Sequence, residues 1–163
     1  QRLLNQGDEV TLCLAEDRAT FAVGNATLST SLLQVEFPNY RQLIQPSYPN
    51  TLTVAREALL EAVRRCRIFA RETTPVRLEM TATSLKLSVI TQDIGNSEEE
   101  IDCSLEGTEM TVGFNPEYLA AGIEAVTGDE ITIQTTDPQR PAVLRGVGAE
   151  DYLYLVMPQR LTV

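Results

Sequence analysis

Histidine is absent from this sequence of 163 residues, and the only lysine is Lys86. The absence of histidine excludes Ser-His-Asp triads, Cys-His dyads and histidine-containing zinc sites, and it removes the most common general base at neutral pH. An enzyme built from this sequence would have to use carboxylates, and no catalytic pair of carboxylates stands out. The composition therefore argues against an enzyme, and a carboxylate-based hydrolase is the one catalytic alternative.

Cysteine is scarce, and long apolar runs are missing. Cys13, Cys66 and Cys103 lie far apart without a Cys-x-x-Cys pair. This spacing disfavours a zinc ribbon or a redox motif and is typical of buried thiols in a reducing compartment. No apolar run approaches the roughly 20 residues of a membrane helix. Residues 1–4 do not resemble a signal peptide, so we expect a soluble globular protein and interpret the N-terminus as a cut end.

Positive charge is scarce overall but concentrated locally. The formal net charge is −10, with 13 basic and 23 acidic residues. Taken globally, this balance argues against nucleic-acid binding. Five arginines nevertheless fall within one short stretch: Arg56, Arg64, Arg65, Arg67 and Arg71. We therefore expect one basic surface on an otherwise acidic protein.

The first 36 residues predict strands but no complete domain. Alternating residues at 9–14, 18–23 and 26–32 are typical of a three-stranded antiparallel meander. Such a meander cannot bury its own apolar face. Residues 36–50 contain three prolines and no periodicity. We therefore place a domain boundary after residue 36.

Residues 37–163 predict one complete α+β domain, with two helices packed on antiparallel sheets. One helix is expected at 55–71, and a second runs from an Asn115 cap and Pro116 to about residue 126. The expected strands are 51–54, 76–80, 84–91, 100–105, 109–114, 130–136, 142–146 and 153–158, and residues 93–100 are expected to form a polar loop. Residues 6–21 align with residues 127–144, so residues 1–36 are interpreted as the end of a preceding copy of the same fold.

The helix at 55–71 predicts three surfaces. Its core stripe contains Leu59, Val63, Cys66 and Ala70. Arginines gather on a flank next to this stripe, while Ile68 projects almost opposite the core. The simple interpretation is a solvated arginine face with one exposed isoleucine. The sharper interpretation is a helix that offers arginine to phosphates and Ile68 with Phe69 to another subunit.

Two further features were considered as sites. The acidic residues Asp93, Glu98, Glu99, Glu100 and Asp102 lack the spacing of a calcium loop and are interpreted as a solvated loop. The C-terminal residues from Tyr152 to Leu161 are rich in aromatic and apolar groups. A final core strand that ends at Pro158 explains most of them. The apolar tail beyond Pro158 suggests the rim of a groove for a partner peptide.

Three motifs resemble the bacterial DNA sliding clamp, the beta subunit of DNA polymerase III. They are Phe37-Pro38-Asn39-Tyr40-Arg41, Gly113-Phe114-Asn115-Pro116-Glu117-Tyr118-Leu119, and the C-terminal run from Tyr154 to Leu161. Their order and spacing fit the family across essentially the whole chain. The resemblance implies a DNA-clamp fold with three copies per subunit. Residues 1–36 would be the C-terminal part of the second clamp domain, and residues 37–163 the third.

The same resemblance implies a function without catalysis. Two subunits close head to tail into a homodimeric ring around duplex DNA and act as a processivity factor of DNA replication in the cytoplasm. Arg56, Arg64, Arg67 and Arg71 would face the DNA, and Ile68 and Phe69 would lie at the subunit interface. Partners would be the DNA polymerase III alpha subunit, the clamp loader and other proteins with a clamp-binding motif. No cofactor or metal is implied.

A pocket for partner peptides is the last feature that the resemblance implies. Its third-domain wall would consist of Pro38, Gln42, Leu43, Asn115, Tyr118, Val143, Leu155, Val156, Met157, Pro158, Gln159, Arg160 and Leu161. Relatives often carry a basic residue at the position of Gln42 and methionine at that of Gln159, and these differences bear on which peptide is preferred. A peptide-binding module without a nucleic-acid role is the alternative to a clamp, and the arginine concentration separates the two.

Overall fold

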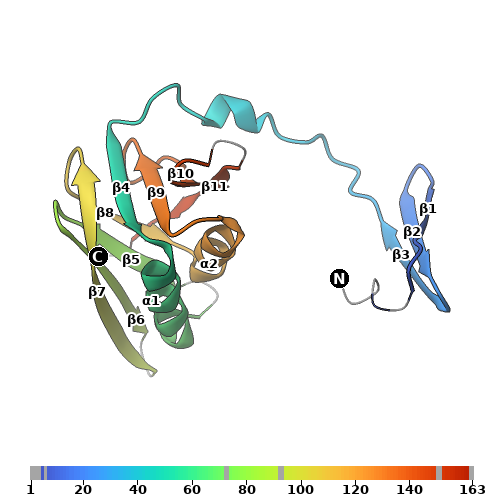
Figure 1. The fold of residues 1–163 in the computed structure, drawn as a ribbon, viewed down its shortest axis with the longest axis horizontal. Coiled ribbons are helices and arrows are strands. Elements are labelled where there is room, and N and C mark those ends of the chain that lie inside the picture. The colour runs from blue at the N-terminus through green and yellow to red at the C-terminus, as the bar shows by residue number, and fades with distance from the viewer. Residues whose placement is uncertain (1–4, 6, 72–73, 92–93, 150–151, 162–163) are drawn as a thin grey trace. The chain divides into compact units, whose positions relative to one another are not determined.

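The structure is a computed structural model, and it describes residues 5, 7–71, 74–91, 94–149 and 152–161 (Figure 1). The chain forms two compact units, Gln1–Asn39 and Tyr40–Val163. The division falls three residues after the boundary expected from the sequence, so Phe37 and Pro38 belong to the first unit.

The first unit contains the expected meander. Its strands are β1 (Thr11–Leu14), β2 (Arg18–Val23) and β3 (Ala26–Ser31), paired antiparallel in the order β1-β2-β3. Among the described residues of this unit only Ala19 and Val23 are buried. Apolar side chains of β1 and β3, such as Leu14 and Leu28, are exposed. Three strands alone bury too little apolar surface to form a core.

The second unit begins with a short 3₁₀ helix, η2 (Tyr40–Leu43), and contains one sheet and two helices. Its strands are β4 (Asn50–Ala55), β5 (Val76–Met80), β6 (Ser84–Thr91), β7 (Gly95–Glu106), β8 (Met110–Phe114), β9 (Glu130–Thr135), β10 (Ala142–Gly146), β11 (Tyr154–Val156) and β12 (Pro158–Gln159). Within the described residues, nine strands pair antiparallel in the order β11-β10-β9-β4-β7-β6-β5-β8-β12. This architecture agrees with the predicted α+β class.

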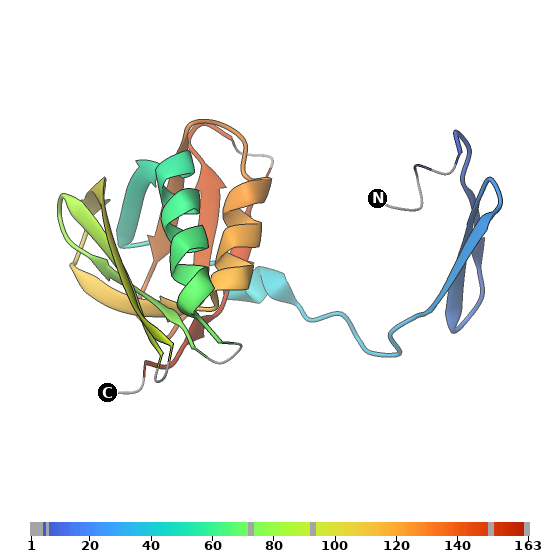
Figure 2. The same ribbon diagram turned by 90° about the horizontal axis from the view of Figure 1, so that it is seen from below.

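The two helices lie side by side on one face of this sheet (Figure 2). Helix α1 (Arg56–Phe69) buries Leu59, Val63 and Cys66, which recur at helical spacing and form one apolar stripe. Burial raises the pKa of the Cys66 thiol, which keeps this thiol protonated and unreactive. The core between the helices and the sheet is therefore the one that the apolar periodicity predicts.

Helix α2 (Pro116–Ala125) begins where the sequence predicts. The side chain of Asn115 accepts hydrogen bonds from the backbone N–H groups of Glu117 at 2.8 Å and Tyr118 at 3.3 Å. Pro116 occupies the first helical position, where its missing N–H costs no intrahelical bond. This cap fixes the direction in which the chain enters α2 from strand β8.

The polar loop predicted at 93–100 is wrong, because strand β7 already begins at Gly95. Glutamates disfavour strands by propensity, but here they lie on a half-exposed surface opposite β6. Lys86 on β6 forms an ion pair of 2.9 Å with Glu98, and Arg65 on α1 pairs with Glu99 at 2.9 Å. These tertiary partners stabilise an acidic strand. Of the acidic residues considered as a site, Asp93 lies outside the described residues. The described part of the chain contains no group of three or more histidine, cysteine, aspartate or glutamate residues that could hold a metal ion.

Asn50 is one of the few polar residues buried in the domain, and it joins three segments at the start of β4. Its Nδ2 donates to the backbone oxygens of Thr135 and Thr136 at 3.3 and 3.2 Å. Its Oδ1 accepts from the N–H of Thr108 at 2.8 Å. The amide thus connects β4 to the end of β9 and to the turn between β7 and β8.

No helix in the described part of the chain is long and apolar enough to cross a membrane.

Candidate partner pocket and nucleic-acid interface

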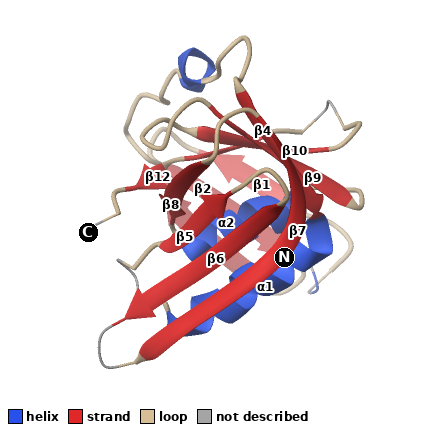
Figure 3. Cartoon of the chain, turned by 90° about the vertical axis from the view of Figure 1, so that its left-hand side faces the viewer, coloured by secondary structure: helices blue, strands red, loops and turns tan. Residues whose placement is uncertain are grey.

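The C-terminal segment connects the two outer edges of the sheet. Strand β11 pairs with β10 at one end of the strand order (Figure 1). Strand β12 pairs with β8 at the other end (Figure 3). The expectation that Pro158 ends the last strand is therefore wrong, because Pro158 opens a second short strand. Proline is tolerated at the first position of an edge strand because its missing N–H leaves no ladder bond unmade. Met157 lies at the crossing and is 58% exposed.

The C-terminal segment packs closely against two glycines of the domain. A Cβ added at Gly122 on α2 would lie 2.5 Å from the ring of Tyr154. A Cβ added at Gly113 on β8 would lie 2.6 Å from Cδ2 of Leu161 and 3.0 Å from the backbone oxygen of Gln159. A residue larger than glycine at either position would therefore overlap the ring of Tyr154 or the side chain of Leu161. Both ends of the crossing segment are positioned by these close contacts.

A cavity of about 570 Å³ opens beside β12. Its lining comes from β8, from the turn between β9 and β10, and from the C-terminal segment: Thr111, Val112, Gly113, Pro138, Gln139, Pro158, Gln159, Arg160 and Leu161. A cavity of this size is within the range of small-ligand and side-chain pockets. Oε1 of Gln159 is buried and has no hydrogen-bond partner among the described residues. Gln159 thus contributes both a lining side chain and a buried acceptor to this part of the domain.

The structure brings together some of the predicted pocket residues and separates others. Pro158, Gln159, Arg160 and Leu161 line the cavity. Leu43, Tyr118 and Met157 are exposed outside its lining, at 42%, 63% and 58%. Gln42 on η2 is also exposed, and Leu155 on β11 and Asn115 at the cap of α2 are half-buried. Pro38 belongs to the first unit.

Two of the predicted pocket residues are buried, and five lining residues were missed. Val143 is completely buried on β10 opposite Leu155, and Val156 is 2% exposed within the core. A completely buried side chain cannot present surface to a peptide, so the assignment of Val143 is corrected. Thr111, Val112 and Gly113 on β8 line the cavity instead, together with the turn residues Pro138 and Gln139. The only signal for these two turn residues in the sequence is the turn-forming run Asp-Pro-Gln-Arg-Pro at 137–141.

We predict that Gly113→Val displaces the C-terminal segment without unfolding the domain. The added methyl groups would overlap the side chain of Leu161, and such overpacking costs about 1–3 kcal/mol. Hydrogen exchange of residues 159–161 should become faster by at least about tenfold, the equivalent of 1.4 kcal/mol. Thr111→Val on the same strand is the control and should leave exchange unchanged. Equal protection in both variants would show that Gly113 does not position the segment.

The arginine flank of α1 is exposed but paired with carboxylates. Arg64 Nη2 lies 2.8 Å from Glu124 Oε1, and Arg67 Nε lies 2.5 Å from Glu117 Oε1, so both pairs join α1 to α2. Arg56 pairs with Glu57 at 3.3 Å and donates to the backbone oxygen of Gly128 at 2.8 Å.

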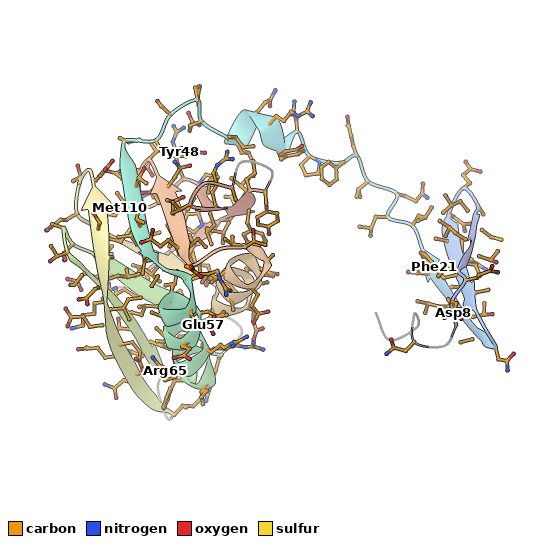
Figure 4. All side chains as sticks on the ribbon, in the orientation of Figure 1. Asp8, Phe21, Tyr48, Glu57, Arg65 and Met110 are labelled. Atoms are coloured by element: carbon orange, nitrogen blue, oxygen red, sulfur yellow. The ribbon has the colours of Figure 1, made fainter. Side chains whose placement is uncertain are left out.

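Two further arginines of this region, Arg65 and Arg71, do not pair with a residue of α2 among the described residues. Arg65 contacts Glu61 and Glu99, and its guanidinium holds the pKa of Glu99 below its usual value. Figure 4 labels Arg65 and Glu57 on α1. Arg71 follows the helix end and has no ion-pair partner among the described residues.

Ile68 and Phe69 occupy different environments at the end of α1. Ile68 is 75% exposed, as the helical pattern predicts. Phe69 is half-buried, packs against the core, and lies where a Cβ added at Gly95 would meet its ring at 3.7 Å. Ile90 on β6 is also exposed, at 74%. The large apolar group available for another molecule on α1 is thus Ile68, with Phe69 contributing less surface.

Comparisons with known proteins show which family this domain resembles. Residues 41–160 match the family described as DNA polymerase III beta subunit, C-terminal domain. The beta sliding clamp of Streptomyces coelicolor is 30% identical over 172 residues, which cover 99% of this chain and 46% of the relative. The beta sliding clamp of Synechococcus elongatus is 31% identical over 161 residues, which cover 96% of this chain and 43% of the relative.

Solved structures agree with these relatives. Caulobacter crescentus pol III beta superposes with a TM-score of 0.78 at 25% identity, over 98% of this chain and 44% of that one. The sliding clamp from Bartonella birtlesii bound to griselimycin superposes with a TM-score of 0.77 at 26% identity, over 96% of this chain and 43% of that one. The chain spans less than half the length of these relatives. It belongs to the family of the DNA polymerase III beta subunit, the bacterial sliding clamp, through its C-terminal domain.

Proposed function

We propose that the protein carrying this chain is a processivity factor of DNA replication, a ring that encircles duplex DNA and tethers its partners. The match of residues 41–160 to the C-terminal domain of the polymerase III beta subunit carries this proposal. Residues 1–36 are assigned to the end of the second clamp domain and residues 37–163 to the third. Its task is topological and involves no catalysis, cofactor or metal, and it takes place in the cytoplasm.

The cavity beside β12 and exposed Met157 form the surface to which partner peptides bind. Proteins with a clamp-binding motif, among them the DNA polymerase III alpha subunit and the clamp loader, would insert one or two apolar side chains here. Pro158 and Leu161 offer apolar contact to such side chains. Affinity at such sites depends on a few buried anchors, with neighbouring contacts excluding water.

The ends and flanks of α1 supply the other two surfaces of a clamp. Ile68 contacts the next subunit of a homodimeric ring, with Phe69 beneath it. Arg56, Arg64, Arg67 and Arg71 lie toward the DNA and contact phosphates without reading sequence. The exposure of Ile68 supports a subunit contact, because a large apolar side chain on an exposed helix face gains free energy when it is covered.

Replacing Met157 with alanine should weaken peptide binding by about 1–3 kcal/mol through lost apolar burial. The fold should remain stable because Met157 is exposed in the unliganded chain. Fluorescence anisotropy with a labelled peptide from the tail of a polymerase III alpha subunit measures the affinity. Ile68→Ala, an exposed apolar change on α1, is the matched control and should not change peptide affinity. Equal affinity of the Met157 variant and the parent chain would show that the pocket is misplaced.

A peptide-binding module without a nucleic-acid role is the second candidate. The four arginines within α1 are matched by four glutamates on α1 and α2, so the two helices together carry no net charge. Retention of the full-length protein on circular DNA, and its loss after the circle is linearised, separates the two candidates. A ring slides off a linear end, whereas a peptide-binding module is retained on neither form.

A further inference from the structure

Two glutamates of α2 form ion pairs with two of the arginines that are proposed to face DNA. Glu124 contacts Arg64 at 2.8 Å and Glu117 contacts Arg67 at 2.5 Å. All four side chains are about half exposed, between 48% and 56%. The two pairs lie about one helical turn apart along α1, since Arg64 and Arg67 are three residues apart. Both ion pairs are therefore accessible to solvent, and to a ligand that approaches from it.

A phosphate that approaches these arginines must replace a carboxylate. An exposed arginine–carboxylate pair contributes about 0–1 kcal/mol, which is small enough to break and large enough to reduce the gain from a new phosphate contact. The displaced carboxylate stays on the same face, close to the phosphate, and repels it. The net gain per arginine is therefore smaller than that of an arginine such as Arg71, which has no ion-pair partner within the described part of the chain.

We propose that Glu117 and Glu124 compete with DNA phosphates for Arg67 and Arg64, so that the helix face contacts duplex DNA through weak contacts that exchange rapidly. This inference rests on the proposed clamp function and adds a residue-level reason for mobility. The glutamates supply an alternative partner each time a phosphate leaves, which lowers the cost of moving from one phosphate to the next. Tight binding of the same arginines would hold the protein in place on the duplex.

The test compares three double variants of the chain on a short fluorescein-labelled linear duplex, titrated at several salt concentrations. Glu117→Gln with Glu124→Gln removes both competing carboxylates. Glu79→Gln with Glu106→Gln makes the same change in net charge on the outer face of the sheet. Both control residues are exposed and alternate with inward-facing neighbours on β5 and β7. Arg64→Gln with Arg67→Gln tests whether this face contacts DNA.

The α2 variant should bind DNA about tenfold more tightly at low salt, because two competing and repelling charges are gone. Its plot of log K against log salt should become steeper by about 0.9 for each newly formed phosphate contact. The sheet variant should bind only slightly more tightly, with the slope of the parent chain. The arginine variant should bind more weakly than the parent chain.

Each other outcome has a definite meaning. Equal effects of the α2 and sheet variants would overturn the competition, because net charge alone would then explain the gain. If the arginine variant binds as the parent chain does, the helix face is not the DNA surface, and the proposed function fails at this point. Absence of binding by all variants, including the α2 variant, would overturn the competition, whereas the clamp function itself is tested by retention on circular DNA. Circular dichroism and the Tm of each variant, expected within a few degrees of the parent, establish that folding is intact.

Discussion

Phe114→Ala should lower the free energy of unfolding by about 3–5 kcal/mol, the range for loss of a buried phenylalanine ring. Phe114 is completely buried at the end of β8, opposite Val76 on β5 and Pro158 on β12. Removing the ring leaves a cavity between the sheet and the start of α2. Since a domain of this size is stable by only about 5–15 kcal/mol, much of the stability would be lost.

Urea unfolding followed by circular dichroism measures the change induced by Phe114→Ala. Strand β12 pairs with the residues around Phe114, so peptide affinity should fall together with stability. Ile90→Ala is the matched control, because it truncates a side chain that is 74% exposed. We expect it to change stability by no more than about 0.5 kcal/mol. A loss below about 1 kcal/mol for Phe114→Ala would contradict the burial of the ring.

Asn50→Ala should destabilise the domain by about 2–4 kcal/mol, because it removes one buried and two partly buried hydrogen bonds to backbone groups. The affected groups are the carbonyls of Thr135 and Thr136 and the N–H of Thr108. Gly107 packs directly against Asn50, so the turn has little room to rearrange when the Asn50 side chain is changed. Its φ is +122°, and a Cβ there would lie 2.4 Å from Oδ1 of Asn50. The turn is therefore shaped around this amide.

Asn96→Ala on the exposed part of β7 serves as the control for Asn50 and should change stability by less than about 0.5 kcal/mol. Chemical denaturation of both variants gives the comparison directly. Hydrogen exchange should also show faster opening at residues 106–109 in the Asn50 variant, because the N–H of Thr108 loses its acceptor. Similar values for the two variants would mean that water replaces the lost amide at little cost.

Much of the fold could be predicted because it depends on local patterns. The stripe of Leu59, Val63 and Cys66 determines the buried face of α1, and the Asn115–Pro116 pair determines where α2 begins. Strands β5, β6 and β10 coincide with the predicted ranges. In each case the signal lies within one element, so neighbouring residues suffice to specify it.

The start of β7 could not be predicted in this way. An acidic run is favoured as a strand only when a partner strand and opposite charges lie beside it. Lys86 and Arg65 provide those charges from β6 and α1. Their positions relative to Glu98 and Glu99 depend on packing between segments, which the local pattern of residues 93–100 does not contain.

The sequence by itself determined the motifs that relate this chain to the sliding clamps, the arginine concentration on α1 and the exposure of Ile68. Only the tertiary structure decided that β12 continues the C-terminal segment on β8, that Pro138 and Gln139 line the cavity, and that Val143 does not. It also decided that Arg64 meets Glu124, 60 residues away along the chain. The physical reason is the same throughout: periodicity and capping act over one or two turns, whereas pairing of strands, cavities and charges depends on which distant segments pack together.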